Sequence, residues 1–109
     1  SQYEPCLYFS TGDRFWCGRR DISDVWHANR MEQERLHPTQ KPLSLIALSI
    51  ESSTELEAIV YEPFSGSGTT IIACEQLGRR CRAVEISPGY VAVALERWAT
   101  ATGKTPVLL

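Results

Sequence analysis

The sequence predicts an α/β domain with parallel strands and crossover helices, preceded by a β-hairpin. Two observations support this prediction. From residue 43 onward, helix-like and strand-like segments alternate along the chain, and this alternation is typical of parallel strands joined by helical crossovers. A glycine-rich turn at residues 62–70 lies between a short apolar run and a helix-like run. In α/β folds, ligand sites form at turns of this kind.

The N-terminal third of the chain predicts the hairpin. Residues 6–9 (Cys-Leu-Tyr-Phe) have the bulk of a strand, and residues 10–13 (Ser-Thr-Gly-Asp) have the composition of a turn. Residues 15–17 (Phe-Trp-Cys) then provide the returning strand. From Arg19 to Arg35 the pattern weakens, and Val25 and Trp26 can form a short strand. Residues 29–36 are polar and charged, so we expect a loop there.

A hexapeptide, His-Pro-Thr-Gln-Lys-Pro at residues 37–42, comes before the first predicted helix. Its two prolines favour an extended backbone, and Pro42 suits the first position of a helix. Apolar residues then recur at helical spacing as far as about Ser53, and they predict one buried face. These residues are Leu43, Ile46, Ala47 and Ile50.

The glycine-rich turn is predicted to connect a strand to a helix. Residues 58–61 (Ala-Ile-Val-Tyr) read as the strand, and the helix runs from Ile71 to Leu77 and stops at Gly78. Arg79 and Arg80 follow, and cations are favoured beside a helix C-terminus.

A second strand, a third helix and a possible final strand complete the predicted order. The second strand covers residues 81–84, and residues 106–109 are the possible final strand. Ser87 can cap the third helix with Pro88 at its first position, and Gly103 ends that helix. Its predicted apolar stripe consists of Val91, Ala94, Leu95 and Trp98.

Composition narrows the class of protein. A net charge of −2 and a pI of about 5.6 argue against a chain that binds nucleic acid unaided. No segment has the length and apolarity of a membrane span, and we expect a cytoplasmic protein without a membrane partner. No metal-ligand spacing occurs, so free thiols are expected at four positions. These are Cys6, Cys17, Cys74 and Cys81.

The absence of an initiator Met and of a signal-peptide pattern suggests a processed product or a piece of a longer protein.

The residues around the turn discriminate between possible ligands. A phosphate-binding P-loop needs a Lys after its last glycine, where this chain has Thr69, and a dinucleotide fingerprint needs a third glycine, where it has Ile71. Glu62 suits a positively charged ligand, and S-adenosylmethionine carries an ammonium and a sulfonium group. Glu85 lies 19 residues beyond Gly66, where an acid can accept hydrogen bonds from a ribose diol.

Ile86, next to Glu85, leaves two interpretations open. It can form an apolar wall against an adenine ring, or it can be an ordinary core residue.

With these motifs in place, the sequence resembles the DNA amino-methyltransferases that act on adenine N6 or cytosine N4, in the circularly ordered group whose cofactor motifs come last. Residues 37–42, 62–70, 83–86 and 90–98 carry the resemblance. It implies a partial Rossmann-like, S-adenosylmethionine-dependent methyltransferase fold. The chain would be the C-terminal, cofactor-binding part, with the hairpin and loop over residues 1–36 and the α/β unit over residues 37–109.

The resemblance also implies a cofactor site. Thr39, Gln40 and Lys41 would close over the amino-acid end, with Lys41 facing the carboxylate. The turn would line the methionine part, Glu85 would hold the ribose, and Ile86 would pack on adenine. Glu62 stands where the family usually has Asp. The implied turn residues are Glu62, Phe64, Ser65, Gly66, Ser67, Gly68, Thr69 and Thr70.

The family's catalytic motif is missing from the chain. That motif is an acidic or amide residue followed by Pro-Pro and an aromatic residue, and no two prolines are adjacent in this sequence. We therefore expect no catalytic residue in the chain. The complete enzyme would be a prokaryotic or phage-type N6-adenine or N4-cytosine methyltransferase of DNA methylation and restriction-modification, acting on double-stranded DNA. The alternative is a non-catalytic methyltransferase remnant that binds or completes a partner.

The missing part has a structural consequence. In the family sheet, the strand at residues 59–61 is central and pairs with the strand that carries the catalytic motif. Without this neighbour its edge is unpaired. We therefore expect the missing N-terminal portion or a second copy of the chain as partner, a swapped hairpin, or marginal stability.

Overall fold

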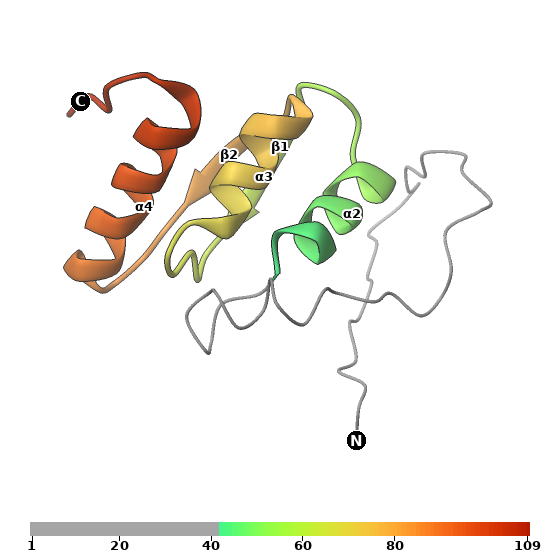
Figure 1. The fold of residues 1–109 in the computed structure, drawn as a ribbon. Helices are drawn as coiled ribbons and strands as arrows, with labels where there is room; N and C mark the ends of the chain where they lie inside the picture. The colour runs from blue at the N-terminus through green and yellow to red at the C-terminus, as the bar shows by residue number, and fades with distance from the viewer. Residues whose placement is uncertain (1–41) are drawn as a thin grey trace.

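The computed structural model describes residues 42–109, and these form three helices and two strands in the predicted alternating order (Figure 1). The predicted hairpin and residues 37–41 of the hexapeptide lie outside the described residues. The elements are α2 (Leu43–Ser53), β1 (Ile59–Glu62), α3 (Thr69–Leu77), β2 (Arg80–Ala83) and α4 (Pro88–Thr102).

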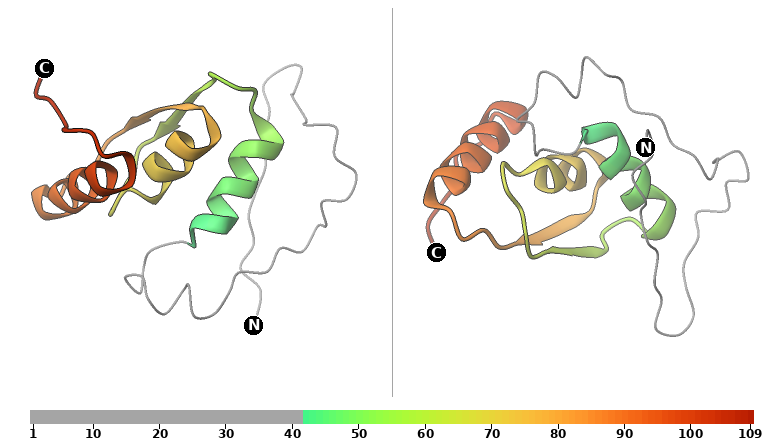
Figure 2. Two further views of the ribbon diagram at one scale, coloured as in Figure 1. Left: turned by 45° about the horizontal axis from the view of Figure 1, so that its top comes forward. Right: turned by 90° about the horizontal axis from the view of Figure 1, so that it is seen from below.

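The two strands are parallel, as predicted, and α3 is the crossover between them. In the register of the pair, Ile59 lies opposite Arg80 and Glu62 lies opposite Ala83. Both strands therefore end at the same edge, where the glycine-rich turn begins. Two further views show the described helices on one side of the two-stranded sheet (Figure 2).

The core lies between α2, α3 and the sheet. Ile50, Ala73 and Cys74 are buried at its centre, and Val60 and Cys81 face it from the two strands. The predicted apolar face of α2 is confirmed, because its other three members, Leu43, Ile46 and Ala47, also pack against this cluster.

The opposite face of the sheet is exposed. Side chains alternate across a strand, so Ile59 and Tyr61 point away from the core that Val60 faces. They are 64% and 67% exposed. Within residues 42–109, no helix lies over this face (Figure 2).

Most predicted helix ends are confirmed. Gly78 and Gly103 adopt left-handed backbone after α3 and α4, and the Ser87 hydroxyl accepts a hydrogen bond from the Tyr90 N–H at the start of α4. Pro42 precedes α2 as its N-cap instead of being its first residue. The helix after the turn begins at Thr69, two residues earlier than predicted, because Gly68 serves as its N-cap.

Two predictions for the C-terminal part were wrong. Residues 104–109 form no strand, since the described part of the chain pairs only β1 with β2. The apolar stripe of α4 is buried only at Ala94, whereas Val91 and Leu95 are 38% and 48% exposed. The reason is that α4 lies at the margin of the described structure, where its main helix contact is α3.

No helix within residues 42–109 combines the length and the apolar character needed to cross a membrane.

Candidate functional site at the glycine-rich turn

The glycine-rich turn leaves the end of β1 and enters α3 through two residues with left-handed backbone. Gly66 has φ +58° and Gly68 has φ +88°, values that side chains with a Cβ rarely adopt. Backbone hydrogen bonds fix the turn: the Gly68 N–H donates to the Ser65 carbonyl at 3.1 Å, and the Ser65 N–H donates to the Val84 carbonyl at 3.0 Å. The turn is therefore anchored to the end of β2.

Gly66 and Gly68 have different surroundings. A Cβ at Gly66 would meet no atom within 4 Å, so this position opens away from the protein. A Cβ at Gly68 would lie 2.7 Å from the Cβ of Ala94 on α4. Gly66 thus offers its backbone to an approaching ligand, while Gly68 allows α4 to pack closely.

Glu85 lies directly beyond β2 and binds the turn. Its carboxylate accepts hydrogen bonds from the Gly66 N–H at 2.7 Å and from the Ser87 N–H at 2.8 Å. The Ser87 N–H, followed by the Gly66 N–H, lowers the pKa of the Glu85 carboxyl below its ordinary value. Glu85 is therefore a carboxylate at neutral pH.

Glu62 brings a second carboxylate to the same edge of the sheet. It accepts hydrogen bonds from the Thr70 hydroxyl at 2.8 Å and from the Phe64 N–H at 3.2 Å. Two carboxylates from neighbouring strand ends thus flank one turn. Such an arrangement favours a ligand with positive charge.

The hydroxyl groups at the start of α3 are engaged within the protein. Ser67, Thr69 and Thr70 are all buried. The Thr70 hydroxyl donates to Glu62, and the oxygens of Ser67 and Thr69 accept hydrogen bonds from Arg97 on α4. These side chains therefore shape the turn from behind.

Two apolar side chains flank the turn on its outer side. Phe64 is 87% exposed and Ile86 is 97% exposed. The interpretation of Ile86 as a core residue is therefore wrong. Between the two strand ends, the Ser65 hydroxyl oxygen is buried and has no hydrogen-bond partner among the described residues. A buried polar atom without a partner is costly, and a ligand group can satisfy it.

The structure thus brings together most of the predicted site. Glu62, the turn, Glu85 and Ile86 meet at the carboxyl ends of β1 and β2. Thr39, Gln40 and Lys41 lie outside the described residues. Within residues 42–109, no cluster of three or more His, Cys, Asp or Glu side chains is suited to a metal ion.

Sequence reasoning missed Arg97. It stands three residues after Ala94 on α4, so both side chains lie on the same helix face. The spacing places Arg97 beside Ala94, but the sequence does not show which face of the helix packs against the turn or which groups Arg97 contacts.

Comparisons with known proteins agree on one family. A family model described as DNA methylase, for N6 and N4 methyltransferases, matches residues 13–96. The chain is 35% identical over 95 residues to the type II methyltransferase M2.MboI of Moraxella bovis, covering 84% of this chain and 34% of that protein. It is 41% identical over 66 residues to the type II methyltransferase M.HindIII of Haemophilus influenzae, covering 61% of this chain and 21% of that protein.

A solved structure supports the same conclusion. The crystal structure of the M1.HpyAVI–SAM complex matches with a TM-score of 0.63 at 28% identity, covering 79% of this chain and 44% of that one. The chain therefore spans less than half the length of these relatives.

Proposed function

The chain belongs to the N6/N4 DNA methylase family, and from that premise we propose that it is the cofactor-binding part of an S-adenosylmethionine-dependent DNA methyltransferase. The target is the exocyclic amine of adenine or cytosine in double-stranded DNA. One observation carries the proposal: the carboxylates of Glu62 and Glu85 both bind a turn that opens at Gly66. A cationic nucleoside without phosphate fits this arrangement.

The residues present fit this ligand. The unpartnered Ser65 hydroxyl, the open side of Gly66 and two carboxylates all lie at one edge of the sheet. S-adenosylmethionine supplies a methyl group on a positively charged sulfur, which an amine nitrogen can accept. We exclude a pyrophosphate ligand, because its negative charge would lie beside two carboxylates.

Each side chain has a distinct role in the proposed site. Glu85 accepts the hydrogen bonds of the ribose diol, and Ile86 packs against the adenine ring. Phe64, Ser65 and Gly66 line the methionine part. Four buried residues of the turn and the partly buried Glu62 hold its shape. The buried residues are Ser67, Gly68, Thr69 and Thr70. Thr39, Gln40 and Lys41 are proposed to close over the amino-acid end.

The groups that activate the target base belong to another part of the protein. The chain has no adjacent prolines, so the Pro-Pro catalytic motif lies elsewhere. The target base is flipped out of the duplex in enzymes that modify bases. In our proposal this chain holds the methyl donor, while the rest of the enzyme binds DNA and positions the base. The complete enzyme acts in the cytoplasm, where the DNA of a bacterium is found.

The exposed side of the sheet supports a proposal for where the rest of the enzyme binds. Ile59 and Tyr61 offer an apolar surface on one face of β1. Within residues 42–109 this strand pairs only with β2, and sheet edges that lack a partner pair readily with further strands. We propose the missing N-terminal portion as the partner in the complete protein. A second copy takes its place in the isolated chain, and light scattering distinguishes a dimer from a monomer.

Calorimetry with S-adenosylmethionine tests the site. We expect the wild-type chain to bind and the Gly66→Ala variant to lose at least about tenfold in affinity, because the new Cβ projects from the open side of the turn. Gly103→Ala is the matched control. Gly103 also has positive φ, +71°, with nothing within 4 Å of a Cβ, but it lies at the far end of α4. Equal losses in both variants, or no binding by the folded wild-type chain, would contradict the proposal.

A further inference from the structure

Arg97 connects α4 to the buried side of the glycine-rich turn. One guanidinium nitrogen, Nη1, donates to the Ser67 carbonyl at 2.9 Å, to the Ser67 hydroxyl at 3.2 Å and to the Thr69 hydroxyl at 3.3 Å. All three acceptors are uncharged oxygens. Hydrogen bonds from a charged donor are stronger than those between neutral groups, so this contact holds the segment on either side of Gly68.

Ala94 supports the same segment one helical turn earlier. The Cα of Ala94 would lie 3.2 Å from a Cβ at Gly68, so the backbones of α4 and the turn approach closely at this point. Ala94 and Arg97 are three residues apart and share one helix face. Together they contact Ser67, Gly68 and Thr69 in succession.

The cation is held partly away from water. Burial lowers the pKa of the Arg97 guanidinium from its ordinary value, although arginine remains charged at neutral pH. Placing a charge in such a position is unfavourable unless hydrogen bonds compensate. The contacts with the turn provide this compensation, so losing them affects both Arg97 and the turn.

We propose that Arg97 is a positioning residue for the ligand site. It fixes residues 67–69 from behind, so that the neighbouring Ser65 hydroxyl and the open side of Gly66, whose N–H is held by Glu85, keep their positions toward the ligand. The inference rests on the proposed function for the identity of that ligand. The stabilisation of residues 67–69 by Arg97 does not depend on a ligand and can be measured without one.

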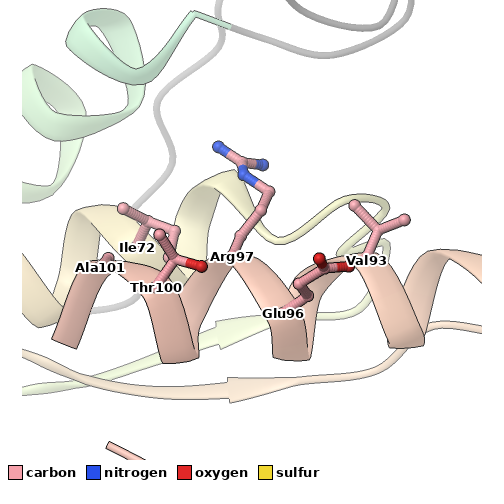
Figure 3. Close-up of a pocket in the computed structure, with 6 residues that line it drawn as sticks. All are labelled: Ile72, Val93, Glu96, Arg97, Thr100 and Ala101. Atoms are coloured by element: carbon pink, nitrogen blue, oxygen red, sulfur yellow. The ribbon is translucent and has the colours of Figure 1, made fainter. Parts of the chain in front are cut away.

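The competing explanation for the effect of Arg97 is that only the packing of its aliphatic side-chain carbons matters, and not its hydrogen bonds. Arg97 also lines an open groove of about 350 Å³ between α3 and α4 (Figure 3). The other lining residues are Ile72, Val93, Glu96, Thr100 and Ala101. Arg97→Met keeps an unbranched stem in this groove but removes the donors, whereas Arg97→Lys keeps a cation. Glu96→Met is the matched control, because Glu96 lines the same groove.

Amide hydrogen exchange of the full chain tests the holding of the turn. The Gly68 N–H donates to the Ser65 carbonyl, so its exchange reports opening of the turn. We expect the Gly68 N–H to exchange at least about tenfold faster in Arg97→Met than in the wild type. In Arg97→Lys we expect a smaller increase, and in Glu96→Met no change. Wild-type exchange in Arg97→Met, or an equal increase in Glu96→Met, overturns the proposal.

Calorimetry on the same proteins tests the consequence for binding. We expect Arg97→Met to weaken S-adenosylmethionine binding at least about fivefold, with Arg97→Lys closer to the wild type. Unchanged affinity despite faster exchange overturns the positioning role. The wild-type chain can also fail to bind S-adenosylmethionine while the Arg97 variants change hydrogen exchange as expected. That result contradicts the proposed function and shows that Arg97 only stabilises the turn.

Discussion

The Glu85 carboxylate accepts a hydrogen bond of 2.7 Å from the Gly66 N–H, 19 residues earlier in the chain. This contact joins the segment after β2 to the turn after β1, which parallel pairing places at the same edge of the sheet. A second hydrogen bond, from the Ser87 N–H, orients the same carboxylate at the start of α4. Glu85 therefore connects three parts of the site.

The first prediction concerns acid stability. The pKa of Glu85 is lowered in the folded chain, so its contribution to stability is complete above the ordinary glutamate pKa of about 4.3. The contribution is lost as the pH falls through the lowered folded-state value. We expect the melting temperature of the wild-type chain to fall more steeply in this window than that of Glu85→Gln.

Melting curves at a series of pH values check this prediction. Glu55→Gln provides the control, because the side chain of Glu55 is exposed. If Glu85→Gln and the wild type lose stability in parallel as the pH falls, the hydrogen bonds of Glu85 do not stabilise the fold.

The second prediction concerns Gly68. Gly68→Ala places a Cβ 2.7 Å from the Ala94 Cβ at a residue with φ +88°. The left-handed backbone costs about 1–2 kcal/mol for a residue with a Cβ, and overpacking adds about 1–3 kcal/mol. We expect urea denaturation to show a loss of about 2–5 kcal/mol.

Gly103→Ala separates the two contributions. It has a similar φ, +71°, but no atom lies within 4 Å of its Cβ, so we expect a loss of only about 1–2 kcal/mol. Equal losses in the two variants would show that α4 does not pack closely against the turn.

The alternation of helices and strands could be predicted because each element carries a local signal. Apolar residues at helical spacing from Leu43 to Ile50 predict α2. Gly78 and Gly103 predict the ends of α3 and α4. All of these signals depend only on residues close together in the sequence. The position of Glu85 was predictable for a related reason, since parallel strands bring their carboxyl ends together.

The packing of α4 could not be predicted in the same way. Its sequence contains apolar residues on more than one side, and only the tertiary structure selects the face with Ala94. The contact between Arg97 and Ser67 spans 30 residues, and no local pattern encodes it. A charged residue also reads as solvent-exposed until its hydrogen-bond partners are known.

The third prediction concerns Arg79, which ties two helix ends together. Its guanidinium donates to the Leu77 carbonyl at 2.7 Å, to the Thr54 hydroxyl at 3.0 Å and to the Thr54 carbonyl. Thr54 caps α2, and Leu77 ends α3. Because charge-assisted hydrogen bonds contribute about 1.5–3 kcal/mol, we expect Arg79→Met to lower the free energy of unfolding by about 2–3 kcal/mol.

Arg80→Met is the control for that measurement. Arg80 pairs with Glu57 at 3.2 Å, but the two side chains are 61% and 72% exposed. Exposed ion pairs contribute little, so we expect a change within about 0.5 kcal/mol in urea denaturation. A larger loss for Arg80→Met than for Arg79→Met would be inconsistent with the structure.

The fourth prediction concerns the reactivity of two core thiols. Cys74 and Cys81 are free. Burial raises the pKa of both, and for Cys81 burial together with the neighbouring Cys74 raises the pKa to about 12. Only about one Cys81 side chain in 10⁴ is then a thiolate at pH 8.

Iodoacetamide should therefore modify both cysteines at least about a hundredfold more slowly in the folded chain than in urea. Mass spectrometry of the peptides that contain each cysteine measures the two rates separately. Rapid modification of Cys74 in the folded chain would show that the core between α3 and β2 opens readily, contrary to its burial in the structure.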